Sequence, residues 1–131
     1  MIDRIKLEYA LETNRLLWEP LSQQHAVHLF AALSDPRIYT FIPQDAPRSL
    51  LELQNGYRQL ESGQSPAGDA LWLNWAIKTG GCGKNIGLVE ATIQEDKAAL
   101  LAYGLSPEYW HRGYAREACL RVIEGYLASA G

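Results

Sequence analysis

One stretch of the chain, residues 101–118, has residue types and a spacing that suit the binding of a phosphate group. It has the pattern of an apolar strand, a turn at Pro107, a loop that holds Gly113, and the start of an amphipathic helix. The first turn of a helix has N–H groups without intrahelical partners and the positive end of the helix dipole, and a glycine lets an anion approach the backbone. His111, Arg112 and Arg116 add positive charge around this loop. The stretch predicts an anion site; the alternative interpretation is a helix-start glycine flanked by solvated arginines.

The segment after the loop has the periodicity of an amphipathic helix. Its apolar positions recur at i, i+3, i+4 and i+7, and they are Ala115, Ala118, Cys119, Val122, Ile123, Tyr126, Leu127 and Ala130. Because Cys119 falls on this stripe, we expect a core thiol there, whereas Cys82 lies in a glycine turn. The loop is therefore predicted to end on a helix that packs against a sheet.

The rest of the chain predicts the elements that position this loop. We expect a strand over 15–19, a helix from Ser22 to about residue 33 with Ser22 as its N-cap, and a second helix from Pro47 to about residue 62 with Pro47 in its first turn. The sequence pattern for a further short strand, over residues 5–9, is weaker. Three strands then follow in close succession, over 71–78, 85–94 and 98–105, and their short links require antiparallel pairing. The order β-α-α-β-β-β-α predicts an α+β fold.

Bulk properties limit the classes of function. With 131 residues the chain is long enough for one domain with a real core. A formal net charge of −3 argues against a nucleic-acid-binding protein that relies on phosphate neutralisation. The sequence shows neither a signal-peptide core nor an apolar run of membrane-spanning length, and its two cysteines suit reduced thiols, so we expect a cytoplasmic protein. His25 and His28 have no carboxylate or cysteine at ligand spacing, so no metal site is expected.

Residues 107–118 resemble the acetyl-CoA pyrophosphate loop of the GNAT (general N-acetyltransferase) superfamily, whose usual pattern is Gln/Arg-x-x-Gly-x-Gly/Ala. Gly113 and Ala115 match the last two positions, and Trp110 stands where Gln or Arg is commoner. Residues 11–16 and 38–49 resemble the opening strand and the segment before the second helix in the subgroup with the ribosomal-protein alanine N-acetyltransferases. The resemblance covers nearly the whole chain. It implies a GNAT-like fold with a mostly antiparallel sheet and helices on both faces.

The resemblance also implies a reaction and its site. Acetyl-CoA is the implied co-substrate, and its acetyl group is transferred directly from the thioester to a primary amine of a protein N-terminus or a small molecule. The implied cofactor-binding residues lie on the last strand of the meander and on the loop, and they are Tyr103, Gly104, Leu105, His111, Arg112, Gly113, Tyr114, Ala115 and Arg116. The strand residues would hold the pantetheine arm as if it were an added strand, and the loop N–H groups would hold the pyrophosphate.

Candidate catalytic and acceptor-binding residues come from the same three strands. The N–H of Leu105 is the candidate donor to the oxyanion, and Glu90 is the candidate general base because it lies mid-strand, where a carboxylate facing the cleft has a raised pKa. Trp72, Asn74 and Trp75 are candidates for lining the acceptor pocket. The alternative for Glu90 is a solvated sheet face, and the alternative for the two tryptophans is the core.

The chain ends at the close of the predicted last helix, whereas GNAT proteins continue with a strand, a helix and a hairpin. We therefore expect residues 1–131 to form a single, incomplete N-acetyltransferase domain whose independent catalysis is open. An unpaired edge on the 98–105 strand and an exposed apolar patch beside the last helix then predict a homo-oligomer. Two alternatives stay open: an inactive relative that binds CoA or a protein, and an interaction module in which the glycine loop is incidental.

Overall fold

The computed structural model describes residues 13–40, 44–63, 65–80 and 83–130. Its helices and strands are β1 (Leu16–Pro20), α2 (His25–Leu33), α3 (Leu50–Leu60), β2 (Ala70–Thr79), β3 (Asn85–Gln94), β4 (Ala99–Leu105) and α4 (Tyr114–Ala130). Short 3-10 turns span Pro36–Tyr39 and Pro107–Tyr109. The predicted order β-α-α-β-β-β-α is confirmed. The weaker strand at 5–9 and Cys82 lie outside the described residues.

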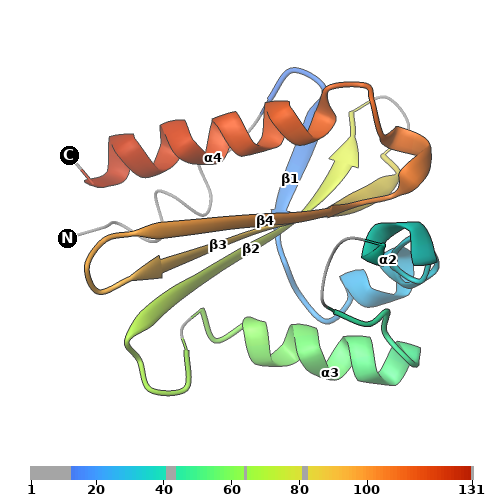
Figure 1. Ribbon diagram of the computed structural model, residues 1–131, viewed down its shortest axis with the longest axis horizontal. Helices are drawn as coiled ribbons and strands as arrows, with labels where there is room; N and C mark the ends of the chain where they lie inside the picture. Colours follow the sequence, from blue (N-terminus) through green and yellow to red (C-terminus); the bar gives the residue numbers. More distant parts are fainter. Residues whose placement is uncertain (1–12, 41–43, 64, 81–82, 131) are drawn as a thin grey trace.

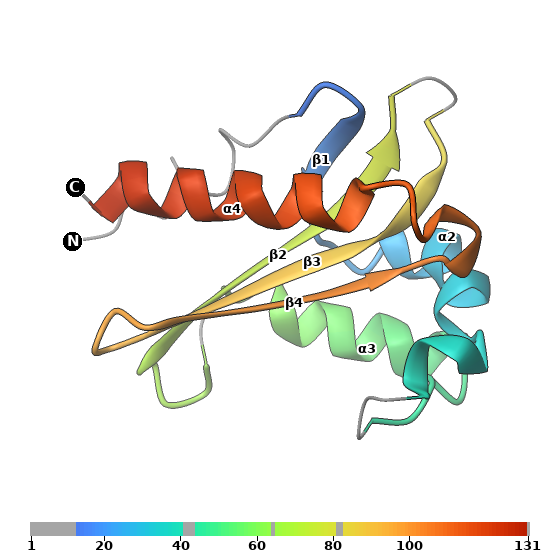
Figure 2. The same cartoon turned by 45° about the horizontal axis from the view of Figure 1, so that its top comes forward.

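The four strands form one antiparallel sheet with the order β1-β2-β3-β4. Helix α4 lies along one face of this sheet, and α2 and α3 lie on the other face (Figures 1 and 2). The α+β class and the placement of helices on both faces are therefore as predicted. Among the described residues, no helix combines the length and the apolar character that a membrane crossing needs.

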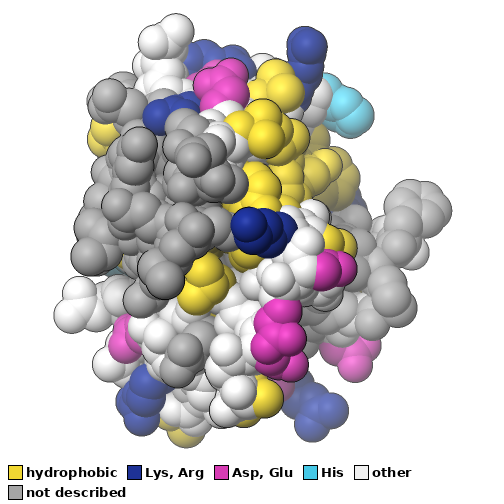
Figure 3. All heavy atoms as spheres, turned by 90° about the vertical axis from the view of Figure 1, so that its left-hand side faces the viewer, with side chains coloured by type: hydrophobic (Ala, Val, Ile, Leu, Met, Phe, Trp, Pro, Cys, Tyr) yellow, Lys and Arg dark blue, Asp and Glu magenta, His cyan; other side chains and the backbone are white. Residues whose placement is uncertain are grey.

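Helix α4 buries only part of its predicted apolar stripe. Ala118 and Val122 are buried against the sheet, whereas Ile123 is 43% exposed and Leu127 is 65% exposed. Figure 3 shows the end of the molecule where α4 and the β3–β4 turn lie, and hydrophobic side chains gather at its upper part, at the level of α4. Ile123 and Leu127 therefore face solvent, whereas Tyr126 packs against the core.

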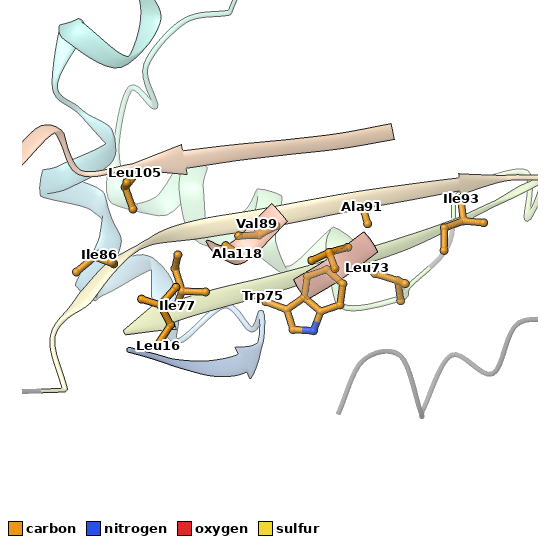
Figure 4. Packing of buried hydrophobic residues seen from close by; sticks show 11 residues of the cluster. Leu16, Leu73, Trp75, Ile77, Ile86, Val89, Ala91, Ile93, Leu105 and Ala118 are labelled. Atoms are coloured by element: carbon orange, nitrogen blue, oxygen red, sulfur yellow. The ribbon is translucent and has the colours of Figure 1, made fainter. Parts of the chain in front are cut away.

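The core has two layers because side chains alternate between the two faces of each strand. Leu73, Trp75 and Ile77 of β2 point toward the α4 side and pack with the apolar residues of β3 and β4 (Figure 4). Ala76 and Leu88 point the other way and pack with α2 and α3. The parity of a residue's position on its strand thus decides which helix it meets.

The starts of the two N-terminal helices differ from the prediction. Ser22 does not cap α2: its backbone N–H donates to Nδ1 of His25 at 3.0 Å, and the helix begins three residues later, after Gln24. Pro47 lies before α3 rather than in its first turn. The cap is Ser49, whose Oγ accepts from the N–H of Glu52 at 3.0 Å. At α3 the Ser49 hydrogen bond fixes the helix start, whereas Gln24, the N-cap of α2, makes no side-chain capping bond.

Strands β3 and β4 approach each other closely at Gly87. A Cβ atom there would lie 2.1 Å from the carbonyl oxygen of Gly104 and 3.0 Å from the Cα of Leu105. Both obstructing atoms belong to the backbone, so the strands would have to separate to admit it. Gly87 therefore sets the position of the last residues of β4.

We expect the Gly87→Ala variant to lose about 3 kcal/mol of unfolding free energy, because overpacking against backbone has no cheap relief. Urea unfolding followed by circular dichroism measures this. Gly56→Ala on α3 is the matched control: nothing lies within 4 Å of its Cβ, and alanine favours a helix interior. An equal loss in both variants would contradict the close approach at Gly87.

Candidate active site

The outer edge of β4 presents a row of backbone hydrogen-bonding groups. The N–H of Ser106 donates to the carbonyl of Ile86 at 2.8 Å, and the N–H of Gln94 donates to the carbonyl of Ala98 at 2.9 Å. In the β3–β4 register these bonds belong to the even-numbered residues of β4, so the N–H groups of the odd-numbered residues point away from β3. Within the described residues, β4 pairs with a strand on one side only. The edge at residues 101–105 thus has backbone groups that can pair with an extended ligand or with another strand.

The loop between β4 and α4 has a backbone that few side chains tolerate. Gly113 has φ of +81°, and His111, although not a glycine, has φ of +63°. Helix α4 begins at the next residue, Tyr114, so the loop ends on N–H groups that lack intrahelical partners. Non-glycine residues in the left-handed region cluster at functional sites. The predicted anion site therefore has the geometry of an N–H-lined helix start.

Arg15 holds this loop from the far end of the sheet. Its Nε lies 2.6 Å from a carboxylate oxygen of Glu117, and its guanidinium donates to the carbonyl of Arg112 at 2.9 Å. The same guanidinium lies 4.3 Å from the centre of the Tyr114 ring. Sequence reasoning missed this role, because nothing local to residue 15 signals a partner about one hundred positions away.

A cavity of about 670 Å³ runs from the β4 edge to the loop on the α4 side of the sheet. Nearly all of its lining comes from β4, the loop and the first turn of α4: Leu101, Ala102, Tyr103, Gly104, Leu105, Tyr109, Trp110, His111, Gly113, Tyr114, Ala115 and Arg116, joined by Arg37 and Ile38. The indole N–H of Trp110 donates to the carbonyl of Leu105 at 2.8 Å and so ties the loop to the strand end. Eight of the nine predicted cofactor-binding residues line this cavity, and the ninth, Arg112, lies exposed on the loop beside it.

A second cavity, of about 560 Å³, lies on the α2 and α3 side of the sheet. Glu90, Trp72 and Tyr57 line it, and it shares Ala102, Tyr103 and Gly104 with the first cavity. Burial raises the pKa of the Glu90 carboxyl above its usual range. The two cavities therefore meet at the same segment of β4 from opposite sides, and a carboxyl of altered acidity lines one of them.

The three residues predicted to line the acceptor pocket, Trp72, Asn74 and Trp75, do not lie together in one cavity. Trp72 lines the second cavity, and Asn74 lies directly opposite Glu90 in the β2–β3 register, nearly buried. The prediction for Trp75 is wrong: it is fully buried on the α4 side of the sheet, edge-on to Trp18. Its position has the opposite parity to 72 and 74, so its ring cannot reach the cavity that they approach.

Sequence reasoning also missed Tyr57. Tyr57 packs in the apolar core between α2, α3 and the sheet, and it also lines the second cavity. Among the described residues, no group of three or more His, Cys, Asp or Glu side chains has the arrangement of a metal site.

The sequence model of the acetyltransferase (GNAT) domain matches residues 15–130. This match covers most of the chain, and the four-stranded antiparallel sheet with helices on both faces is the fold of GNAT acetyltransferases. The chain belongs to the GNAT acetyltransferase family.

Individual relatives are distant. An uncharacterized N-acetyltransferase, YoaA of Bacillus subtilis, is 22% identical over 123 residues, which are 92% of this chain and 68% of that protein. A GNAT-family acetyltransferase structure from Bacillus anthracis superposes with a TM-score of 0.68 at 16% identity, covering 87% of this chain and 63% of that one. The structure of spermidine N-acetyltransferase from Vibrio cholerae, in complex with CoA and spermine, gives a TM-score of 0.70 at 17% identity, covering 88% of this chain and 66% of that one. This chain thus spans roughly two thirds of the length of these relatives.

Proposed function

We propose that this protein transfers an acetyl group from acetyl-CoA directly to a primary amine. The observation that carries the proposal is the meeting of two cavities at residues 102–104 of β4, one beside the N–H-lined loop and one beside Glu90. Two substrates that enter from opposite faces of the sheet would come together at this strand edge. A direct transfer needs such a meeting point, because no covalent enzyme intermediate carries the acetyl group between sites.

The cofactor would lie across the edge of β4 and on the loop. Its pantetheine amides repeat the polar pattern of a peptide and would bond to the outward-facing N–H and carbonyl groups of Tyr103. Its pyrophosphate would accept hydrogen bonds from loop N–H groups between His111 and Arg116. Arg112 and Arg116, both exposed, would add charge complementarity.

The chemistry requires a neutral, deprotonated amine. It also requires a hydrogen-bond donor to the oxyanion that forms at the thioester carbonyl. The N–H of Leu105 points outward at the strand edge and would donate to that oxyanion. Glu90 lies opposite Ala102, three residues along β4, which is about 10 Å from Leu105 at 3.3 Å per residue. A water relay would therefore carry the amine proton to the Glu90 carboxylate.

Calorimetric titration with acetyl-CoA, followed by a coupled thiol-release assay with a panel of primary amines, tests the proposal. We expect acetyl-CoA to bind in the micromolar range, about −8 kcal/mol. Binding and CoA release with at least one amine would support transfer. Binding without release would favour the inactive, CoA-binding alternative, and no binding would favour the interaction module.

We also propose that two copies pair through residues 99–101 of their β4 edges, which leaves the outward-facing groups of Tyr103 and Leu105 free for the cofactor. The strand carries no charged side chain from Ala99 to Leu105, so two antiparallel copies would meet without like-charge repulsion, and their outward N–H and carbonyl groups are complementary. The exposed side chains of Ile123 and Leu127 lie on α4, the helix that covers one face of this sheet.

We expect Ala99→Pro to raise the dimer dissociation constant about tenfold, because proline removes an outward-facing N–H donor from an edge strand without breaking the β3–β4 ladder. Ala99→Val, which keeps the donor, is the control. Sedimentation velocity over a concentration series measures both. A monomeric wild-type chain at high concentration would rule out the pairing.

A further inference from the structure

The hydroxyl group of Tyr57 is buried without a hydrogen-bond partner among the described residues. Tyr57 is 4% exposed, and its hydroxyl oxygen is inaccessible to solvent. Tyr39, which lines the same cavity, differs: its hydroxyl donates to the carbonyl of Leu33 at 2.7 Å. A buried, unpaired hydroxyl costs free energy that a phenylalanine at the same position would avoid. The fold by itself gives no reason for a tyrosine here.

The surroundings of this hydroxyl are those of a ligand site. Tyr57 lines the second cavity together with Glu90, and both are largely withdrawn from solvent. Burial, and then the negative charge of Glu90, raise the pKa of Tyr57, so its hydroxyl stays neutral near pH 7 and keeps its acceptor lone pairs. An amine has several N–H groups and would find two acceptors here, the phenol oxygen directly and the carboxylate through water.

The wider lining of the cavity has a net negative charge. Its charged side chains are three carboxylates, Asp45, Glu52 and Glu90, and one guanidinium, Arg48. Asp45 and Glu52 are exposed, whereas Glu90 is the least exposed of the three. Between them the walls are apolar, with Leu53, Leu60 and Trp72. A cation at each end joined by a methylene chain matches this distribution.

We propose that the acceptor is an aliphatic amine with a second cationic group, and that Tyr57 is an acceptor-binding residue. The reacting nitrogen donates to the Tyr57 hydroxyl and reaches Glu90 through the water relay, the methylene chain lies along the apolar walls, and the second ammonium group lies at Asp45 and Glu52. The unpaired hydroxyl then gains its hydrogen bond only when the acceptor is present. This inference rests on the proposed acetyl transfer and specifies its second substrate.

The test uses amine binding and protein stability, so that it does not depend on turnover. Calorimetric titration of the wild-type chain with 1,4-diaminobutane and with butylamine compares two amines with the same carbon chain, with acetyl-CoA titrated separately. We expect the diamine to bind about tenfold more tightly than butylamine. Tyr57→Phe should weaken the binding of both amines about tenfold and leave acetyl-CoA binding unchanged. Asp45→Asn should lower the diamine's advantage and leave butylamine binding unchanged.

Melting temperatures separate a binding role for the hydroxyl from a structural one. We expect Tyr57→Phe to melt at the wild-type temperature or higher, whereas Tyr39→Phe, which loses an existing hydrogen bond in the same cavity, melts lower. A fall in Tyr57→Phe equal to that in Tyr39→Phe would overturn the inference. Unchanged amine binding by Tyr57→Phe, equal binding of the two amines, or no amine binding by the wild-type chain would overturn it too. If the wild-type chain shows no acetyl-CoA binding, that result would instead count against the proposed function.

Discussion

The Gly113→Asp variant is expected to lose acetyl-CoA affinity by about a hundredfold or more, equivalent to about 3 kcal/mol. Two effects add. Gly113 has φ of +81°, where a side chain strains the backbone, so the loop N–H groups would turn away from the pyrophosphate. The new carboxylate would also place a negative charge at an anion site. Isothermal calorimetry with acetyl-CoA measures the loss.

Two further variants separate strain from site-specific effects. Gly113→Ala adds a Cβ atom about 3.4 Å from a guanidinium nitrogen of Arg15 and should weaken binding less than aspartate does. Gly68→Ala is the matched control: its φ is +75° and its Cβ meets open space, away from both cavities. It should cost about 1 kcal/mol of stability and leave acetyl-CoA binding intact. Wild-type affinity in Gly113→Asp would place the cofactor elsewhere.

The Glu90→Gln variant is expected to lower kcat about 100- to 1,000-fold while leaving acetyl-CoA binding unchanged, because the glutamine amide cannot take the amine proton. Single-turnover CoA release at saturating acceptor measures this. In the wild-type chain, kcat should fall as the pH falls through the raised pKa of Glu90. That limb of the pH profile should disappear in the variant. The pH dependence of its residual rate should then reflect only the protonation of the substrate amine.

The stability of the same variant has a defined sign. The folded chain holds the pKa of Glu90 above the ordinary value of 4.5, because burial disfavours the carboxylate. Such a group contributes its full stability below pH 4.5 and loses that contribution as the pH rises through the folded-state pKa. Glu90→Gln should therefore be at least as stable as the wild-type chain at neutral pH in urea unfolding. A marked loss of stability would indicate a structural role for the carboxylate and weaken its assignment as the base.

The two acceptor-side residues share one property. Tyr57 has an unpaired hydroxyl, and Glu90 has a carboxylate that its surroundings disfavour. Each lowers the stability of the free protein, and each lines the same cavity next to the shared segment of β4. Substitutions that stabilise the chain and reduce acceptor use are the expected signature of a site of this kind.

Local sequence patterns were enough to predict the order of the elements and the location of the loop. Strand alternation, helix periodicity and short links are local properties, so they predicted the antiparallel meander of β2, β3 and β4 and the helix after Gly113. The sequence also contained a signal that the predictions did not use, the parity of positions along β2. Trp75 is an odd number of positions from Trp72 and Asn74, and this parity alone puts it on the other face of the strand.

Which side chains share a cavity depends on how the helices pack on the sheet. Arg15 reaches the loop before α4, and Tyr57 of α3 reaches the face of the sheet where Glu90 of β3 lies. These pairs are brought together by the packing of helices on the two faces of the sheet, and no spacing within a helix or strand encodes that packing. The backbone contact at Gly87 likewise depends on how β3 and β4 approach each other. Local patterns specify elements, but the contacts that make a site form between elements distant in the chain.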